Sequence, residues 1–469
     1  MGDTGSGTFR SRLGINFKIV STKSYNISIM TNNTNWGIIG GGIMGMTLAL
    51  RLIEQGHKVT IYESAEKAGG LASSWKMNDI VWDRFYHVIL MSDLNTRKVL
   101  TEIGLENEFN WVETKTGFYS EGKLYSMSNL IEFFKFPPIN LIDKFRLGLT
   151  IFVASRIKNW KAMEKIHVEK WLTQWSGKRV FNKIWLPLLK AKLGENYKDT
   201  SASFIWATIQ RMYAARRSGL KKEMFGYVNG GYETINKHFV SYLMKAGVEF
   251  KYNSIVASVT QKTGSGKIEM TLTDHTSVNH DKVISTLPSH ISARLSAELS
   301  EDEKKKHQGI RYLGVICATL LLDRKISPYY VTNITENDTP FTGVIEMTAL
   351  INPTQIKGYN LIYLPKYVNA DDSMFNDPDE ILTDLFLNNF LKMYPSVNKE
   401  NVLFCGISRA KNVFSLPTIN YSENLPGIKT SVDNFYIINS AQIINGTLNV
   451  NETIQVAETK LVELLNKNG

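Results

Sequence analysis

Cysteine is nearly absent from this chain, which has only Cys317 and Cys405 among its 469 residues. Two cysteines cannot build a disulfide framework or a cysteine-rich metal site, so the sequence predicts a reduced, cytoplasmic protein without a metal centre. Long hydrophobic runs are missing too. The best candidate, Leu147 to Val153, is followed by Arg156 and falls far short of the ~18 residues of a spanning helix. The chain also lacks internal repeats and the Walker A, HExxH, CxxC and Ser-His-Asp patterns of other enzyme classes.

The net charge of +10 is concentrated in one stretch of the chain. Residues 156–223 hold 16 Lys and Arg against five Asp and Glu, so the remainder is about neutral. A basic surface of this kind attracts a phosphate-bearing substrate or peripheral contact with an anionic membrane, and the alternative is a solvated, lysine-rich helical face. Tryptophans lie among these bases, which suits a lipid-like substrate with an anionic head or a nucleotide sugar. The alternative is that Trp171, Trp175 and Trp185 form a helical core. No nucleic-acid motif accompanies the charge, so we expect no nucleic-acid partner.

Residues 1–33 show no periodicity, and they are interpreted as a flexible N-terminal extension, a targeting peptide or a tag outside the fold. Beyond them the chain is rich in apolar residues, which make up 43% of the whole sequence. This composition excludes disorder, collagen and coiled coil, and the length suggests two or three folding units with real cores.

The first ordered stretch reads as a strand, a glycine turn, a helix, a second strand and an acid. The apolar run 35–39 predicts a buried strand, 46–55 has helical apolar spacing, and 57–63 predicts a strand that ends at Glu63. The turn between them, GGGIMG at 40–45, contains the GxGxxG spacing. This order of elements is typical of a dinucleotide-binding βαβ unit.

Each glycine of this motif has a physical role. Gly40 permits the tight turn, Gly42 lets the backbone approach a pyrophosphate, and Gly45 allows close packing of helix on strand. The start of the helix offers free N–H groups and a positive dipole end to the phosphates. Glu63 can accept hydrogen bonds from a ribose 2′-hydroxyl and would repel a 2′-phosphate, so FAD or NAD fits better than NADP.

The continuation of the chain distinguishes FAD from NAD. Residues 64–72, SAEKAGGLA, place Gly69 and Gly70 where the chain can fold over the pyrophosphate and ribityl parts of an extended flavin dinucleotide. In order and spacing this region resembles the superfamily of flavin-containing amine oxidases, protoporphyrinogen oxidases, phytoene-type desaturases and UDP-galactopyranose mutases. The resemblance implies FAD, and the position of Cys405 implies that FAD is held without a covalent bond.

The resemblance extends over residues 35 to 465. Residues 226–232 resemble the superfamily's second FAD-domain segment. Residues 253–259 resemble the strand whose backbone, near Val256, pairs with adenine. Residues 281–288 resemble the segment that crosses back to the substrate domain. A bacterial subgroup of uncharacterised FAD-dependent oxidoreductases is closer still, through the stretches DRFYH at 83–87, WLPLLKAK at 185–192, YLPKY at 363–367 and NSAQI at 439–443.

Two departures from the superfamily pattern are visible. Its usual Ala-Gly-Asp near the C-terminus is replaced by Ile438-Asn439-Ser440, whose Asn and Ser can still hydrogen-bond to the flavin. The strand at 314–320 lacks the lysine that amine oxidases commonly carry, which disfavours amine oxidation. The residues that we expect to bind FAD are Gly40, Gly42, Ile43, Met44, Gly45, Glu63, Ser64, Gly69, Gly70, Leu71, Ala72, Val256, Asn439 and Ser440.

The predicted fold class is α/β, with a Rossmann-like FAD-binding domain on a parallel sheet interleaved with a mixed-sheet and helical substrate domain. The FAD domain is assigned to residues 34–90, 225–290 and 400–469, and the substrate or cap domain to 91–224 and 291–399. Within the latter, residues 90 to 220 are expected to be helical and basic.

The predicted function is an FAD-dependent oxidoreductase that removes a hydride or two electrons from a small organic substrate. Candidate catalytic residues are Arg84, Tyr86, His87 and Lys192, with His87 as an acid or base near neutral pH. Lys366, Tyr367 and Arg409 lie in matched motifs and suit either the site or a surface. One alternative is a redox-neutral flavin enzyme of the UDP-galactopyranose mutase type that acts on a nucleotide sugar or a polyprenyl-linked sugar. Another is a non-catalytic flavin protein at a membrane surface. The sequence does not give the oligomeric state.

Overall fold

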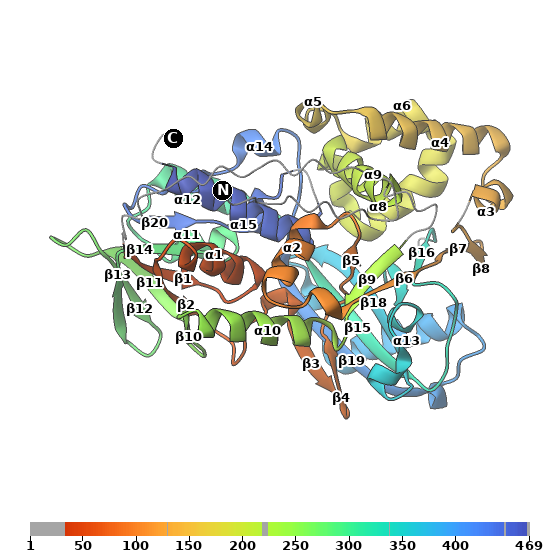
Figure 1. Ribbon diagram of the computed structural model, residues 1–469. Coiled ribbons are helices and arrows are strands. Elements are labelled where there is room, and N and C mark those ends of the chain that lie inside the picture. The colour runs from red at the N-terminus through yellow and green to blue at the C-terminus, as the bar shows by residue number, and fades with distance from the viewer. Residues whose placement is uncertain (1–32, 129, 218–223, 337, 445–446, 467–469) are drawn as a thin grey trace, which may run out of the picture. The chain divides into compact units, whose positions relative to one another are not determined.

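A five-stranded parallel sheet lies under the predicted dinucleotide site. The computed structural model describes residues 33–128, 130–217, 224–336, 338–444 and 447–466, so the expected N-terminal extension lies almost wholly outside the described residues. The sheet has the order β10-β2-β1-β14-β20 and draws its strands from three separate stretches of chain (Figure 1). Its strands are β1 (Asn35–Ile39), β2 (Lys58–Tyr62), β10 (Glu249–Lys251), β14 (Lys282–Ser285) and β20 (Phe435–Ile437).

Both faces of this sheet are buried, which explains why its strands read as continuous apolar runs. Ile38, Ile61 and Ile284 point to one face, where helices α1 (Ile43–Ile53), α10 (Gly231–Lys245) and α15 (Val450–Leu465) complete a core. The side chains that alternate with them, Ile39 and Val283 among them, form a second core with an antiparallel sheet. That sheet consists of β11 (Val256–Gln261), β12 (Ile268–Leu272) and β13 (Ser277–His280).

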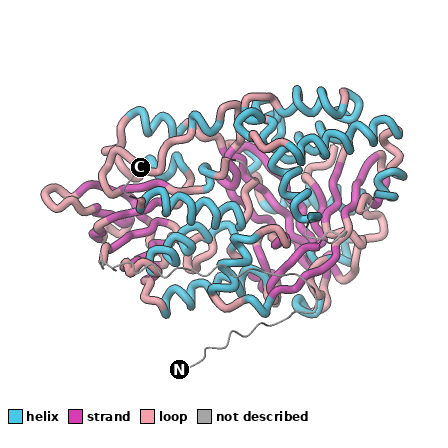
Figure 2. Tube along the Cα trace, turned by 45° about the horizontal axis from the view of Figure 1, so that its top comes forward, coloured by secondary structure: helices cyan, strands magenta, loops and turns pink. Residues whose placement is uncertain are grey.

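A seven-stranded mixed sheet forms the second large element. Its order is β19-β15-β18-β17-β16-β7-β8, with β16 and β7 parallel and the other neighbours antiparallel. Figure 2 shows the strands in magenta with cyan helices packed along them. The strands are β7 (Thr116–Ser120), β8 (Lys123–Ser126), β15 (Tyr312–Leu322), β16 (Val331–Ile334), β17 (Gly343–Glu346), β18 (Asn360–Asn369) and β19 (Val402–Ser415).

Strand β15 is buried along its whole length and separates two cores. Ile316, Ala318 and Leu320 face the helix α13 (Asp379–Met393). Val315 and Cys317 point to the opposite face, where they share a core with side chains from the segment after β4 (Ile80–Asp83). This second face positions the catalytic candidates. The remaining strands are β3 (Ser74–Met77), β5 (Ile89–Leu90), β6 (Phe109–Glu113) and β9 (Met224–Val228).

A group of helices between 130 and 217 has its own core. Trp171 and Trp185 are buried in it, and the indole of Trp185 donates to the Ser176 hydroxyl at 2.8 Å. No helix of the described residues is long and apolar enough to cross a membrane. The helices here are α3 (Leu130–Lys135), α4 (Leu141–Arg156), α5 (Trp160–Glu164), α6 (Val168–Ser176), α7 (Lys178–Val180), α8 (Leu186–Leu193) and α9 (Ala202–Arg217), and elsewhere α2 (Leu94–Glu102), α11 (Ser289–Arg294), α12 (Glu301–Gln308) and α14 (Tyr421–Asn424).

The predicted fold class is confirmed, since a parallel sheet and a mixed sheet are both present. The helical expectation for residues 90 to 220 is wrong over 109–126, which form β6, β7 and β8. These strands are only four or five residues long, so they carry too little alternation to stand out beside the helices that follow. The domain boundaries stay a prediction. Strand β19 lies within residues 400–469, which were predicted to belong to the FAD domain, and it pairs with β15 of the mixed sheet.

Candidate functional site

The glycine turn between β1 and α1 has the geometry of an anion cradle. Gly40 has a φ of 104°, and a Cβ on Gly45 would lie 2.0 Å from the Gly40 carbonyl oxygen, so neither position admits another residue. A Cβ on Gly42 would instead meet only the Gly70 Cα, at 3.8 Å. No described side chain caps the start of α1, and its first turn carries no acid. The N–H groups at Ile43, Met44 and Gly45 therefore begin a helix whose positive end favours a pyrophosphate.

Glu63 is buried where β2 ends, as the sequence predicts, and its carboxylate also braces the glycine turn. Its Oε2 accepts a hydrogen bond from the Gly41 N–H at 2.7 Å. Its Oε1 accepts from the Ala65 N–H at 2.8 Å and from the Ser64 hydroxyl at 3.2 Å. Oε2 has only this one donor and keeps a second lone pair, so Glu63 can still accept a hydrogen bond from a ribose hydroxyl.

The Gly69-Gly70 pair folds back over the glycine turn. The Gly69 N–H donates to the Gly41 carbonyl at 2.9 Å, and both glycines have positive φ angles, 134° and 56°. Ala72 next to them is buried and Leu71 is exposed. The two glycine motifs therefore meet, as expected for a site that encloses an extended dinucleotide.

Asn236 on α10 is a site residue that the sequence reasoning missed. Its Nδ2 donates to the Ala72 carbonyl at 2.8 Å, and a Cβ on Gly69 would lie 2.7 Å from the same nitrogen. Asn236 is buried beside Ile235 on the apolar face of the helix. The sequence could have indicated this role, because Asn236 lies among positions with apolar helical spacing and a buried amide needs hydrogen-bond partners.

The two remaining predicted contacts differ in their surroundings. The Ser254 N–H donates to the Glu63 carbonyl at 2.9 Å, which places Val256, at the start of β11, beside the Glu63 loop. Asn439 is buried, with its Nδ2 donating to the Leu287 carbonyl at 2.8 Å and its Oδ1 accepting from the Ala441 N–H at 2.9 Å. Asn439 thus holds residues 281–288 in place through Leu287. A contact of Asn439 or Ser440 with the flavin stays a prediction.

The residues present fit FAD. The glycine cradle has room where a pyrophosphate would approach, a helix start faces that room, and an acid with one unused lone pair lies at the ribose position. A structural βαβ unit would not need the open space at Gly42.

Replacing Glu63 with alanine is expected to weaken FAD binding by roughly 10- to 100-fold, because hydrogen bonds to a charged group contribute about 1.5–3 kcal/mol. The variant also releases the Gly41 N–H that this carboxylate holds. Equilibrium dialysis with added FAD measures the change, and Glu66→Ala, an exposed acid in the same loop, is the matched control. Equal FAD affinity in both variants would contradict the ribose contact.

Two of the catalytic candidates, Tyr86 and Lys192, meet at Tyr367, and the three residues come from three different elements. Tyr86, in the segment after β4, has its hydroxyl 2.9 Å from that of Tyr367 on β18. The Lys192 Nζ, from helix α8, lies 3.4 Å from the centroid of the Tyr367 ring. Burial raises the pKa of both tyrosines and lowers the pKa of Lys192 to about 7. Lys192 forms no ion pair with a described residue, and its Nζ lies over two aromatic rings, that of Tyr367 and, 6.0 Å from the centroid, that of Phe414.

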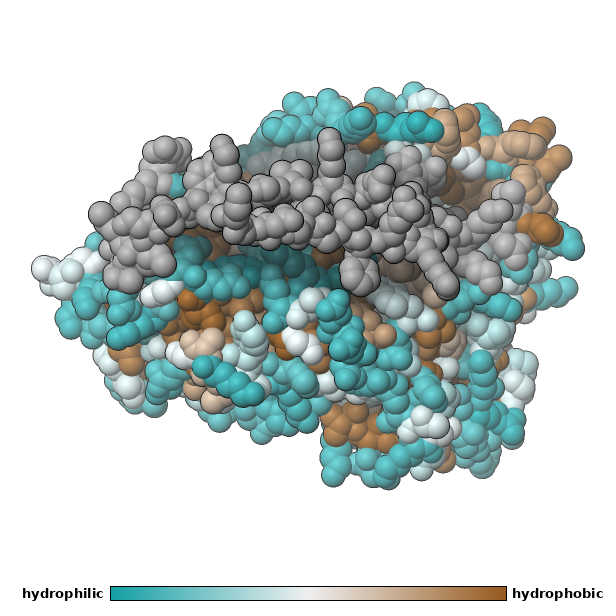
Figure 3. Space-filling view, in the orientation of Figure 1, coloured by the Kyte–Doolittle hydropathy of each residue, from teal (hydrophilic) through white to brown (hydrophobic). Residues whose placement is uncertain are grey.

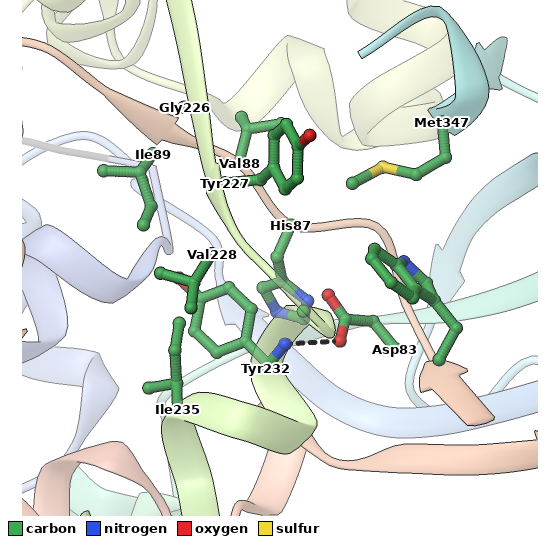
Figure 4. Close-up of a pocket in the computed structure, with 12 residues that line it drawn as sticks. Asp83, His87, Val88, Ile89, Gly226, Tyr227, Val228, Tyr232, Ile235 and Met347 are labelled. Carbon is green, nitrogen blue, oxygen red and sulfur yellow. Dashed lines mark hydrogen bonds between the residues drawn. The ribbon is translucent and has the colours of Figure 1, made fainter. Parts of the chain in front are cut away.

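His87 and Arg84 lie apart from this cluster. Figure 4 shows His87 beside Asp83 and Tyr232, where the three residues line one small cavity. The His87 Nδ1 is 2.8 Å from the Phe85 carbonyl oxygen, and burial lowers the pKa of His87 to about 4. His87 is therefore neutral near pH 7, which does not suit the expected proton exchange at that pH. Arg84 is exposed.

Asp83 is a buried acid in the same cavity that the sequence reasoning did not single out as a titrating group. Its Oδ1 accepts from the Tyr232 N–H at 2.8 Å, and burial raises its pKa to about 8. The carboxyl group is thus protonated at neutral pH. Among the described residues, no three His, Cys, Asp or Glu side chains are grouped as metal ligands would be.

The substitution Asp83→Asn is expected to remove a pH dependence from the stability. Between about pH 4 and about pH 8 the folded protein holds a proton on Asp83 that the unfolded chain lacks, so stability falls as pH rises through this window. Asparagine keeps the acceptor oxygen but cannot ionise. The wild-type decrease in unfolding free energy, about 1.4 kcal/mol per pH unit and up to about 5 kcal/mol over the window, should therefore be absent from the variant. Urea unfolding at both ends of the window measures it, and an equal fall in both proteins would contradict the buried neutral acid.

Comparisons with known proteins agree with this geometry. Residues 43–421 match the family described as flavin containing amine oxidoreductase. The chain is 22% identical over 397 residues to 15-cis-phytoene desaturase of Solanum lycopersicum, which covers 76% of this chain and 67% of that one. The chain spans between about half and two thirds of the length of the first curated relatives it matches.

Two solved structures share the fold. An oxidoreductase from Methanosarcina mazei superposes with a TM-score of 0.72 at 16% identity, covering 91% of this chain and 100% of that one. A reduced UDP-galactopyranose mutase gives a TM-score of 0.70 at 16% identity, covering 92% and 95%. With more than half of its length matched to the family and a glycine cradle that fits the cofactor, the chain belongs to the flavin-containing amine oxidoreductases and is an FAD-dependent oxidoreductase.

Proposed function

We propose that the protein oxidises a small, largely apolar organic substrate at the cluster of Tyr86, Tyr367 and Lys192. The observation that carries the proposal is the Lys192 amine, which lies 3.4 Å from the centre of the Tyr367 ring with its pKa lowered to about 7 by burial. A lysine in this state is half neutral at physiological pH and can take up a proton, which an ordinary surface lysine cannot.

FAD, when bound, supplies the acceptor for the hydride that leaves the substrate carbon. The neutral Lys192 Nζ takes up the proton that leaves the neighbouring substrate atom, so that substrate loses two hydrogens and two electrons in all. Tyr86 and Tyr367 have raised pKa values, remain protonated, and offer hydrogen bonds to a polar substrate group. Dioxygen or another external acceptor completes the cycle. Arg84 and His87 have no assigned part in proton transfer.

The surroundings of the cluster favour a lipid-like substrate. Tyr86 and Tyr367 pack against a core that includes Val315, Cys317 and Tyr363. Burial raises the pKa of the Cys317 thiol, so it stays protonated and behaves as an apolar wall. The curated relatives named as carotenoid and phytoene desaturases support an isoprenoid-type molecule as the first class to test.

The test begins with the visible absorption spectrum of the purified protein and chromatography of what heat releases. Released FAD is then followed by anaerobic mixing with isoprenoids, other lipid-like compounds and nucleotide sugars. Bleaching of the flavin with a product two hydrogens lighter supports the proposal. Turnover of a nucleotide sugar with no net use of an acceptor would overturn it in favour of a redox-neutral reaction.

A further inference from the structure

Helices α3 and α4 present a ridge of large apolar side chains to the outside of the protein. Figure 3 shows brown side chains gathered at the upper right, where these helices lie. Ile131 is 68% exposed, Ile142 71% and Phe145 64%. We call this surface the α3–α4 ridge, and its members are Ile131, Phe134, Leu141, Ile142, Phe145, Leu149 and Phe152.

The α4 members of the ridge share one face of the helix. At 100° per residue, positions 141, 142, 145, 149 and 152 fall within an arc of about 100°. On α3 the ring of Phe134 lies 5.9 Å from that of Phe145, so the two helices contribute to one continuous patch. Monomeric proteins rarely expose contiguous apolar surface of this kind unless something binds it.

Four of the six buried residues of α4 are polar, and Leu147 and Ala154 are the two apolar ones, which departs from the pattern of an ordinary surface helix. Thr150 is fully buried and hydrogen-bonded to the Ser176 hydroxyl at 2.8 Å. Asp143 is buried and pairs with Arg179 at 3.2 Å. Lys144 is buried and donates to the Phe134 carbonyl at 2.7 Å. The helix thus satisfies its polar groups internally while its largest apolar side chains face outward.

Exposed positive charge surrounds the ridge. Between residues 130 and 163 the only acids are Glu132 and Asp143, and both have partners inside the protein. The guanidinium of Arg156 lies 5.0 Å from the Phe152 ring centroid, at the end of the ridge. The exposed bases in this stretch are Lys135, Arg146, Arg156, Lys158 and Lys161.

The basic segment 156–223 is only partly available as the expected membrane contact. The Lys192 Nζ packs on the Tyr367 ring, and Arg211 pairs with the buried Asp93 at 2.9 Å. Residues 218–223, with Lys221 and Lys222, lie outside the described residues. The exposed bases at the start of the segment 156–223, Arg156, Lys158 and Lys161, lie at the end of α4 and directly after it.

We propose that the α3–α4 ridge docks the protein on the surface of an anionic lipid bilayer. Isoleucine, leucine and phenylalanine side chains enter the acyl boundary, and the surrounding Lys and Arg contact anionic head groups. Helix α4 has 16 residues, too few to cross the roughly 30 Å of hydrocarbon, so it lies along the surface. Residues 130–163 carry five exposed bases and no exposed acid, which favours this occupant over a second copy of the chain, whose matching face would bring like charges together.

The test measures cosedimentation of the full-length, FAD-loaded protein with vesicles of equal parts phosphatidylcholine and phosphatidylglycerol. The double variant Ile142→Ser, Phe145→Ser should lower the partition coefficient about tenfold or more, since it removes two membrane-inserted side chains. Ile381→Ser with Leu385→Ser removes exposed apolar residues from α13 and is the matched control, with no change expected. FAD content and melting temperature confirm that each variant folds.

A second pair of measurements tests the charge. Wild-type binding should weaken when salt is raised and when phosphatidylcholine is used alone, because the attraction to anionic head groups is screened or absent. Wild-type protein that does not cosediment with anionic vesicles at low salt would overturn the proposal. So would a wild-type dimer that the ridge variant converts to monomer, which would identify a second copy as the occupant.

Discussion

Replacing Gly42 with valine is expected to abolish FAD retention while leaving the fold intact. A Cβ at this position would meet only the Gly70 Cα at 3.8 Å, so the protein itself tolerates the side chain. The isopropyl group would instead occupy the space through which a pyrophosphate reaches the start of α1. We expect at least a 100-fold loss of FAD affinity, with the melting temperature of the FAD-free protein within about 3 °C of the wild type.

Gly427→Val provides the matched control for this prediction. A Cβ there would also meet a single atom, the Lys429 carbonyl oxygen at 3.8 Å, but far from the glycine cradle in the chain. It should keep FAD. Gly45→Val should fail differently, by loss of folding, because its Cβ would lie 2.0 Å from the Gly40 oxygen. Stoichiometric FAD in the purified Gly42→Val variant would show that the pyrophosphate lies elsewhere.

The cofactor end of the site could be predicted from the sequence because it depends on short-range order. Gly40, Gly42 and Gly45 lie within one turn, and Glu63 follows after a single helix and strand, so spacing alone locates them. Their contact with Gly69 adds only a short loop. Asn236 is more than 160 residues away from this loop, and only the packing of α10 brings it there.

The catalytic end depends on packing that no spacing reveals. Tyr86, Lys192 and Tyr367 come from a loop, a helix and a strand, and each also fits a structural role when considered alone. His87, the expected acid or base, is next to Tyr86 in sequence but lines the cavity of Asp83 and Tyr232, which Tyr86 does not line. The buried polar residues of α4 were equally hidden, since Ser176, the partner of Thr150, belongs to another helix.

Replacing Lys192 with methionine is expected to lower the rate of flavin reduction by about 100- to 1,000-fold without loss of FAD. Methionine fills a similar volume beside the Tyr367 ring but cannot take up a proton. With a pKa of about 7, the fraction of neutral amine rises with pH and is half complete near neutrality. The wild-type rate should therefore rise about tenfold per pH unit below pH 7 and level off above it, whereas the variant should show a flat profile.

Two further observations separate a functional role from a structural one. Lys190→Met on the same helix removes an exposed lysine that pairs with Glu195 at 3.3 Å, and it should leave both rate and pH profile unchanged. Between about pH 7 and about pH 10 the unfolded chain holds the Lys192 proton that the folded protein lacks, so this group lowers wild-type stability as pH falls. The Lys192→Met variant should accordingly unfold at a higher urea concentration than wild type near pH 7. If the variant is more stable but reacts slowly and without pH dependence, the stability lost by burying this amine serves the reaction. An unchanged rate would make Lys192 a packing residue and would overturn its assignment as the base.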